Sequence, residues 1–353
     1  MEREKTIQLR KNVKPYEQSD RRASTMQILN TIPPFFILWG IAYAAYFVSP
    51  WLAAGVAVIA AGFLVRMFII FHDCTHGSFF KKKKANDLLG NITGILTLFP
   101  YEKWKREHII HHATSGNLDK RGTGDIWVMT VEEYNEATPM QRLGYRLYRN
   151  PVVMFGFGPL FLMLVSGRIN RKDAKPKERW NTWLINAAIV ILYSGAILAI
   201  GWQPFLVIQG TVLYTAAVLG IWLFYVQHQF EDSYFEEESE WNYVKAAVEG
   251  SSYYELPPLL QWLTGNIGYH HVHHLAPRVP NYNLETAHVS VPPLQKATTI
   301  TLKTSLESLK FKLFDEANKQ FVTFREWRES QGAPVRRQLP SAKRNPGFGS
   351  HEH

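Results

Sequence analysis

Residues 51–71 read WLAAGVAVIAAGFLVRMFIIF and run directly into HDCTH at residues 72–76. Arg66 is the only charged residue in the apolar stretch. A helix needs about 20 apolar residues to cross the roughly 30 Å hydrocarbon core of a membrane. We therefore expect residues 51–71 to form a membrane-spanning helix whose end carries a pair of histidines.

Three further stretches are long and apolar enough to span a membrane, and two shorter runs are not. The short runs, residues 88–100 and 151–166, have the length of buried or interfacial segments, so we expect them not to cross. Tight turns near Pro50 and at residues 201–204 pair the spans into two hairpins. The sequence thus predicts an all-α integral membrane protein with four transmembrane helices and a helical cytoplasmic cap that carries the histidines. The predicted spans are residues 33–49, 51–71, 183–200 and 204–226.

The distribution of lysine and arginine predicts the orientation of the spans. Neither hairpin turn contains a basic residue, whereas basic residues crowd residues 1–28, 81–84 and 168–179. The positive-inside rule places that side in the cytoplasm, so we expect a multi-pass plasma-membrane protein whose basic side faces the cytoplasm. The net charge of +9 then reflects topology and attraction to anionic headgroups, and we expect no nucleic-acid binding.

The chain divides into one membrane domain and two polar ends. We expect residues 29–330 to form the domain, residues 1–28 a basic cytoplasmic arm, and residues 331–353 a disordered tail rich in Pro, Gly and Arg. Neither end is expected to carry chemistry. The spacing of apolar residues in residues 301–321 predicts a cytoplasmic amphipathic helix. The single cysteine, Cys74, cannot form an internal disulfide.

Ten of the thirteen histidines fall in or beside four places. In the first three places the spacing is i, i+4 or i, i+3, i+4, which puts the rings on one face of a helix. The fourth place is a lone histidine just beyond the last span. The four places are His72 and His76; His108, His111 and His112; His270, His271, His273 and His274; and His228.

This pattern predicts a site for two metal ions. Imidazoles one helical turn apart can converge on one ion, and one ion takes roughly four to six ligands, so eight or nine histidines imply two ions. A structural zinc site is a poor alternative, because such sites hold four ligands and are usually rich in cysteine. All the histidine groups share one side of the membrane only if residues 88–100 and 151–166 do not cross, which again gives four spans.

The boxes HxxxH, HxxHH and HxxHH, with one hydrophobic hairpin before the first and another between the second and third, resemble the membrane fatty acid desaturase family. The resemblance runs from about Asn30 to Arg325. Segments that are similar to the acyl-lipid Δ5 desaturases of this family are IIFHD at residues 69–73, HHATS at 111–115, GTGDIW at 122–127 and GNIGYHHVHH at 265–274.

The resemblance implies a non-haem di-iron centre at the cytoplasmic face, with O2 as co-substrate. It also implies that a histidine near the end of the last span joins the boxes, and His228 matches that position. The expected iron ligands, which are also the expected catalytic residues, are His72, His76, His108, His111, His112, His228, His270, His273 and His274.

Four other histidines are left out of this set. His271 stands at a position that the box pattern leaves free, and on a helix it would lie about 100° from its neighbour His270. His288, His351 and His353 have no cluster partners and are interpreted as surface residues.

Several residues near the boxes have both a functional and an ordinary interpretation. Asp73 and Glu107 adjoin boxes and could accept the second ring N–H of a ligand histidine, or could be solvated charges. Arg66 is expected to snorkel or to pair with a carboxylate. Asn266 could hold a water on a metal. Aromatic residues could line an acyl channel, although interfacial anchoring or packing is the commoner role; they are Phe99, Tyr101, Trp104, Trp222, Tyr225, Trp262 and Tyr269.

The resemblance implies oxygen-dependent desaturation of saturated acyl chains of membrane phospholipids at the Δ5 position. The sequence has no Gly-rich dinucleotide loop and no set of cysteines, so electrons must come from an external donor such as ferredoxin or flavodoxin, which the basic face would suit. The alternatives are a related di-iron hydroxylase or ketolase, and a metal transporter. Transport is disfavoured because every histidine cluster lies outside the spans.

Overall fold

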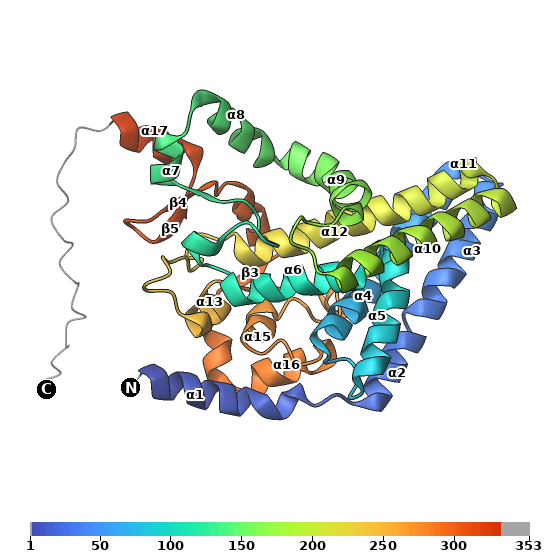
Figure 1. Ribbon diagram of the computed structural model, residues 1–353, viewed down its shortest axis with the longest axis horizontal. Helices are drawn as coiled ribbons and strands as arrows, with labels where there is room; N and C mark the ends of the chain where they lie inside the picture. Colours follow the sequence, from blue (N-terminus) through green and yellow to red (C-terminus); the bar gives the residue numbers. More distant parts are fainter. Residues whose placement is uncertain (1, 333–353) are drawn as a thin grey trace, which may run out of the picture.

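Helices make up most of the structure, a computed structural model that describes residues 2–332. Figure 1 shows long helices reaching one end of the molecule, at the upper right, with short helices and strands gathered at the other end. The helices are α1 (Glu2–Val13), α2 (Arg21–Leu29), α3 (Ile32–Tyr46), α4 (Pro50–His76), α5 (Lys83–Thr97), α6 (Tyr101–Thr114), α7 (Val131–Glu136), α8 (Pro139–Tyr148), α9 (Gly158–Leu164), α10 (Pro176–Ile200), α11 (Trp202–Phe205), α12 (Thr211–His228), α13 (Tyr243–Glu249), α14 (Pro258–Leu263), α15 (His270–Leu275), α16 (Asn281–Ser290) and α17 (Phe324–Gly332).

Four helical segments within the described residues are long and apolar enough to cross a membrane, as predicted. They are residues 21–46 (α2 with α3), 50–76 (α4), 176–200 (α10) and 202–228 (α11 and α12, joined by a π-helical stretch at 206–210). A fifth span is possible by length and composition only if α8 and residues 153–168, whose axes differ by 62°, act as one bent element. The pairing of the spans into hairpins and their side of the membrane stay predictions.

Helix α4 is the centre of the apolar framework. It packs against α3, α5 and α12, and small residues along its length, including Ala53, Ala57, Ala60 and Ala61, are fully buried. Small side chains let helix backbones approach closely, which is how helices associate in membranes. The outer faces of the framework are apolar as well: Trp51 on α4 and Leu198 on α10 are each 87% exposed. Such surfaces suit contact with lipid rather than with water.

The described residues also contain five short strands, which the all-α prediction missed. In one sheet β4 (Leu313–Asp315) pairs in parallel with β1 (Met129–Thr130) and antiparallel with β5 (Gln320–Val322); in the other β2 (Tyr253–Glu255) pairs in parallel with β3 (Thr299–Thr301). The pairing of β1 with β4 ties a segment that follows the first pair of spans to one that follows the second, whereas β2 and β3 both follow the second pair.

The amphipathic helix predicted for residues 301–321 is wrong. This segment contains a 3-10 helix (Thr304–Leu309) and then the β4–β5 hairpin. The Asp315 carboxylate accepts the backbone N–H groups of Ala317 and Asn318, and Lys319 has a left-handed backbone with φ of 53°. That local turn reverses the chain and buries Leu313 and Phe321 in the small sheet. Side-chain turn chemistry therefore outweighs the helical spacing of the apolar residues.

The N-terminal arm is helical and is packed onto the domain. Asp20 caps α2 by accepting the backbone N–H of Ala23 at 2.7 Å. The fully buried Ser24 hydroxyl donates to the Phe79 carbonyl at 2.6 Å, just after the first histidine box. The tail predicted to be disordered lies almost wholly outside the described residues.

Candidate metal centre

The histidines lie in the last turns of helices α4, α6 and α12 and in the short helix α15. Helix α4 begins with Pro50 at its first position and ends at His76, since Gly77 adopts a left-handed conformation with φ of 67° and its N–H bonds back to α4 carbonyls. Helix α12 likewise ends at His228. Helix α6 carries the second box in its last two turns, and the short helix α15 consists mostly of the third box.

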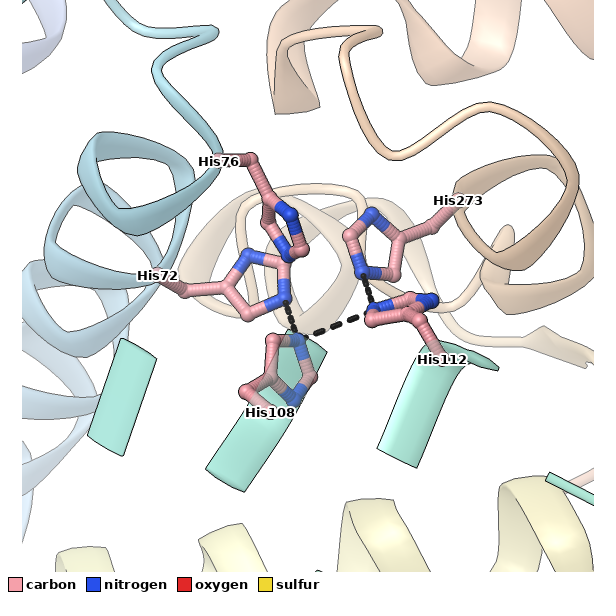
Figure 2. Close-up of side chains that lie close together, drawn as sticks. All are labelled: His72, His76, His108, His112 and His273. Atoms are coloured by element: carbon pink, nitrogen blue, oxygen red, sulfur yellow. Dashed lines mark hydrogen bonds between the residues drawn. The ribbon is translucent and has the colours of Figure 1, made fainter. Parts of the chain in front are cut away.

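Five of the predicted ligands form one group, shown in Figure 2. One ring nitrogen of each lies within 4.8 Å of the corresponding atoms of the others. Nε2 of His108 lies 2.9 Å from Nε2 of His72 and 3.0 Å from Nε2 of His112. Nε2 of His273 lies 2.9 Å from Nε2 of His112. The five are His72, His76, His108, His112 and His273.

The other four predicted ligands form a second group beside the first. His111, His228 and His274 each place a ring nitrogen within 4.8 Å of the other two. Nε2 of His270 is 3.0 Å from Nε2 of His228 and 3.1 Å from Nε2 of His274. The rings of His112 and His274, with centroids 4.3 Å apart, join the two groups. All nine predicted residues therefore converge at one place.

The electrostatics of the site favour neutral, metal-binding imidazoles. Burial, reinforced by neighbouring histidines, holds the pKa well below the ordinary value at positions outside the spans: His108, His112, His270, His273 and His274. Within the described part of the chain, the buried Nε2 atoms of His76 and His111 have no hydrogen-bond partner. Buried polar atoms without partners are uncommon. A cation in each group would satisfy both atoms, because His76 belongs to the group of five and His111 to the other, so the donor set fits a pair of metal ions.

Two ligand candidates are oriented through their second ring nitrogen in the way that the sequence suggests or allows. Nδ1 of His72 lies 3.1 Å from Oδ1 of Asp73, so this carboxylate takes one of the two roles that the sequence left open for it. Nδ1 of His228 is 3.1 Å from the Gly250 carbonyl oxygen. An acceptor at Nδ1 requires the proton there, so each Nε2 keeps its lone pair for a metal.

A second carboxylate in this role was not predicted. Oδ1 of Asp125 lies 2.6 Å from Nδ1 of His111. Glu107, the other carboxylate proposed from the sequence, pairs instead with Lys103, at 3.5 Å between Oε1 and Nζ. The only sequence signal for Asp125 was its place in the GTGDIW segment, which resembles the family. That signal does not reveal the contact with His111, because the contact depends on how the loop folds.

Aromatic side chains enclose the histidines. Trp104 stacks on His108, with ring centroids 4.2 Å apart, and also contacts His72. The ring of Phe224, on α12, contacts the rings of His111 and His228, with centroids 5.1 Å apart in both pairs. Phe224 was not among the aromatics named from the sequence.

Other aromatics named from the sequence have partners away from the ligands. Tyr101 donates to the Cys74 carbonyl at 2.7 Å, and Tyr225 donates to the Ser308 carbonyl at 3.0 Å. The side-chain amide of Asn266 lies 3.4 Å from the Asn281 carbonyl oxygen.

His271 lies apart from both groups, as expected. Its Nε2 is 3.0 Å from Nδ1 of His288, so the prediction that His288 has no histidine partner is wrong. His351 and His353 lie outside the described residues.

The expected pairing of Arg66 with a carboxylate, or its snorkelling to water, is also wrong. Arg66 is buried, donates to the Thr31 hydroxyl at 3.1 Å and to the Trp262 carbonyl, and lies 4.1 Å from the Trp262 ring centroid. A carbonyl and an aromatic face can stabilise a guanidinium without a carboxylate.

The apolar framework fits a membrane protein, and the buried histidines form a candidate centre for metal ions. A family model described as fatty acid desaturase matches residues 49–303. The chain is 59% identical over 321 residues to a fatty acid desaturase of Bacillus subtilis (strain 168), covering 91% of each chain. It is 27% identical over 263 residues to an sn-1 oleoyl-lipid 12-desaturase of Synechocystis sp., covering 71% of this chain and 70% of the relative.

A chloroplastic omega-6 fatty acid desaturase of Brassica napus is 29% identical over 292 residues, which cover 78% of this chain and 61% of the relative. The chain therefore belongs to the fatty acid desaturase family and is an oxidoreductase.

Proposed function

We propose that this desaturase uses two histidine-bound irons and O2 to desaturate saturated acyl chains of membrane phospholipids at the Δ5 position. The observation that carries the proposal is the convergence of nine buried histidines into adjoining groups of five and four. Imidazole suits iron, and two neighbouring groups of this size suit two ions rather than one. Bound iron supplies the activation of dioxygen that an unreactive methylene chain requires.

The protein itself holds, orients and shields the centre. Asp73 and Asp125 accept hydrogen bonds from the Nδ1–H groups of His72 and His111, and so fix the direction in which these rings present Nε2. Trp104 and Phe224 pack against ligand rings on either side and restrict the access of water. These residues leave the chemistry of oxidation to the metals and determine where it takes place.

The substrate follows from the location of the centre and from the relatives. The first box and His228 stand at the C-terminal ends of helices α4 and α12, where apolar spans meet the polar part of the protein. An acyl chain of a membrane lipid can reach this boundary from the bilayer. The Synechocystis relative is described as acting on an oleoyl-lipid, which supports an acyl-lipid substrate for this chain, and the resemblance to Δ5 desaturases supports the position.

The proposal includes an orientation and a source of electrons. Basic residues flank the spans on the side of the histidines, so that side would face the cytoplasm at the plasma membrane. The reaction removes two hydrogens from the chain and reduces O2 to two waters, which requires two further electrons and two protons. A soluble carrier such as ferredoxin or flavodoxin would deliver the electrons.

Expression of the full chain in a host without its own desaturase tests the function. Lipids would be extracted, and double bonds in the phospholipid chains would be located by mass spectrometry. New Δ5 monoenes support the proposal, and Δ9 products would overturn the position. Hydroxylated or keto chains would favour the related di-iron hydroxylase or ketolase.

Metal analysis of the purified protein is the companion measurement. Two tightly held irons per chain support the centre. Several exchangeable zinc ions, without new lipid products, would favour metal transport.

A further inference from the structure

A buried chain of polar groups connects the N-terminal arm to the histidine centre. Nε2 of Gln27, on α2, donates to Oδ1 of Asn281 at 3.0 Å. Asn281, at the start of α16, donates to Oδ2 of Asp73 twice, from its side-chain Nδ2 at 2.8 Å and from its backbone N at 2.7 Å. The other oxygen of Asp73 lies 3.1 Å from Nδ1 of His72. Gln27, Asn281 and Asp73 are at most 3% exposed.

The direction of every bond in this chain follows from chemistry. An ionised carboxylate only accepts hydrogen bonds, so Asn281 must turn its NH2 group toward Asp73 and its carbonyl oxygen toward Gln27. Gln27 must then donate. As a result Oε1 of Gln27 is buried with no hydrogen-bond partner among the described residues. An unsatisfied buried oxygen costs stability, so a residue that retains one calls for an explanation.

An apolar side chain of similar length would bring no unsatisfied oxygen of its own, but it would leave the buried Oδ1 of Asn281 without a donor. Gln27 carries the unsatisfied oxygen instead, and it holds the Asn281 amide in the one orientation that serves the carboxylate. The carboxylate in turn is held by two N–H groups of Asn281 and faces one ring nitrogen. This arrangement fixes the proton of His72 on Nδ1 and directs its Nε2 into the group of five histidines.

We propose that Gln27 and Asn281 are positioning residues for the metal held by the five-histidine group, acting through Asp73 on His72. The inference rests on the proposed di-iron function. It assigns a role in the metal centre to the N-terminal arm, which the sequence alone suggested would carry none. Groups that orient metal-ligating histidines typically change metal affinity 10–100-fold when they are mutated.

The two histidine groups allow a test with an internal control. Full-length protein loaded with iron(II) in detergent is mixed with an excess of chelator, and iron release is followed over time. The variants are Gln27→Met, which keeps the length and removes the bond, and Gln27→Glu, which keeps the shape and places a carboxylate against Oδ1 of Asn281. Ser24→Ala is the matched control, because Ser24 is fully buried on the same helix and its hydroxyl lies within hydrogen-bond distance of the Asp20 and Phe79 carbonyls and the Tyr282 hydroxyl, with no bond to Asp73 or Asn281.

We expect one of the two irons to leave about 10–100-fold faster from Gln27→Met and faster still from Gln27→Glu, while the other iron leaves at the wild-type rate. The melting temperature of Gln27→Met should change little, because the substitution removes one unsatisfied buried oxygen, Oε1 of Gln27, and leaves another, Oδ1 of Asn281, without its donor. Ser24→Ala should release both irons as the wild type does. A role in packing alone would instead lower the melting temperature and affect both irons alike.

Wild-type release of both irons from Gln27→Met would overturn the proposal while leaving the di-iron function intact. A wild-type protein that binds no iron would overturn the proposed function itself, and this inference with it. If Gln27→Met does not fold, Asn281→Leu provides the same comparison, because it deletes the side-chain bonds on both sides and predicts the same loss at one iron.

Discussion

Replacing Asp125 should weaken the second metal site by an amount that the contact with His111 allows us to predict. The two atoms are 2.6 Å apart, and the exposed fractions of the side chains are 16% for Asp125 and 2% for His111, so solvent screens the bond little. A hydrogen bond to a charged group contributes about 1.5–3 kcal/mol, and a neutral one about 0.5–1.5 kcal/mol. Asp125→Asn keeps an acceptor but loses the charge, which costs about 1–1.5 kcal/mol.

That difference corresponds to about a tenfold loss of metal affinity, since about 1.4 kcal/mol is one factor of ten. Asp125→Ala removes the acceptor altogether, and we expect a loss toward the 100-fold end of the range for such residues. The assay is iron release to a chelator, together with iron content and the yield of unsaturated lipid. Only one of the two irons should leave faster, and it should be the one that Gln27 substitutions do not affect.

Asp173→Asn is the control for loss of a carboxylate from the same polar region. Asp173 pairs with Arg106 and lies away from the histidines, so both irons should leave at wild-type rates. Wild-type iron affinity in Asp125→Ala would refute the reasoning, because it would show that the orientation of His111 does not depend on this carboxylate.

Three further predictions test the centre and its framework. His273→Ala should abolish desaturation while leaving membrane insertion intact, whereas His271→Ala, two residues earlier, should keep substantial activity. The measurement is the yield of unsaturated lipid in strains that express each variant. The opposite pattern would mean that the wrong members of the third box were chosen as ligands. Gly90→Ala should lower the melting temperature sharply, because a Cβ there would lie 2.2 Å from a ring carbon of the buried Tyr101. Gly144→Ala is the control and should not lower it, because a Cβ at Gly144 would meet nothing within 4 Å. Equal melting temperatures of the two variants would contradict the close packing of α5 on α6. Removing metal with a chelator should eliminate activity, and iron(II) but not zinc(II) should restore it in a reconstituted assay; recovery with zinc would exclude redox chemistry at the centre.

The parts of the site that local sequence determines were predictable. The spans follow from apolar length, and four helical segments within the described residues are long and apolar enough to cross a membrane, as predicted. The grouping of the box histidines follows from helical spacing together with the expectation that all groups share one side of the membrane, whereas His228 was included because the family resemblance implied it. The first argument uses only the length of an apolar run and the second the periodicity of a helix, which tertiary contacts do not alter.

Contacts made through loops were not predictable in the same way. Asp125 reaches His111 because the loop passes close to α6 at Gly124, which has φ of 76° and whose added Cβ would lie 3.0 Å from Cβ of His111. Glu107 precedes His108 in sequence, yet a neighbour on a helix points about 100° away. The sequence left the orienting role open for the two carboxylates beside boxes, and Asp73 takes it while Glu107 does not. The carboxylate that serves His111 lies 14 positions beyond it in the chain.

The spacing of the second and third boxes itself explains why there are two groups. On a helix, positions i and i+4 differ by about 40°, while i+3 lies about 60° to the other side of i. In the second box the i, i+4 pair, His108 and His112, joins the five-histidine group, and the i+3 residue His111 joins the other group.

The third box does the reverse. Its i, i+4 pair, His270 and His274, lies in the four-histidine group, and His273 lies in the group of five. Each of these boxes thus contributes a pair to one group and a single ring to the other. The first box then adds its pair to one group, and the lone His228 adds a single ring to the other. A spacing of three and four is needed to serve two sites from one helix, which a plain i, i+4 pair cannot do.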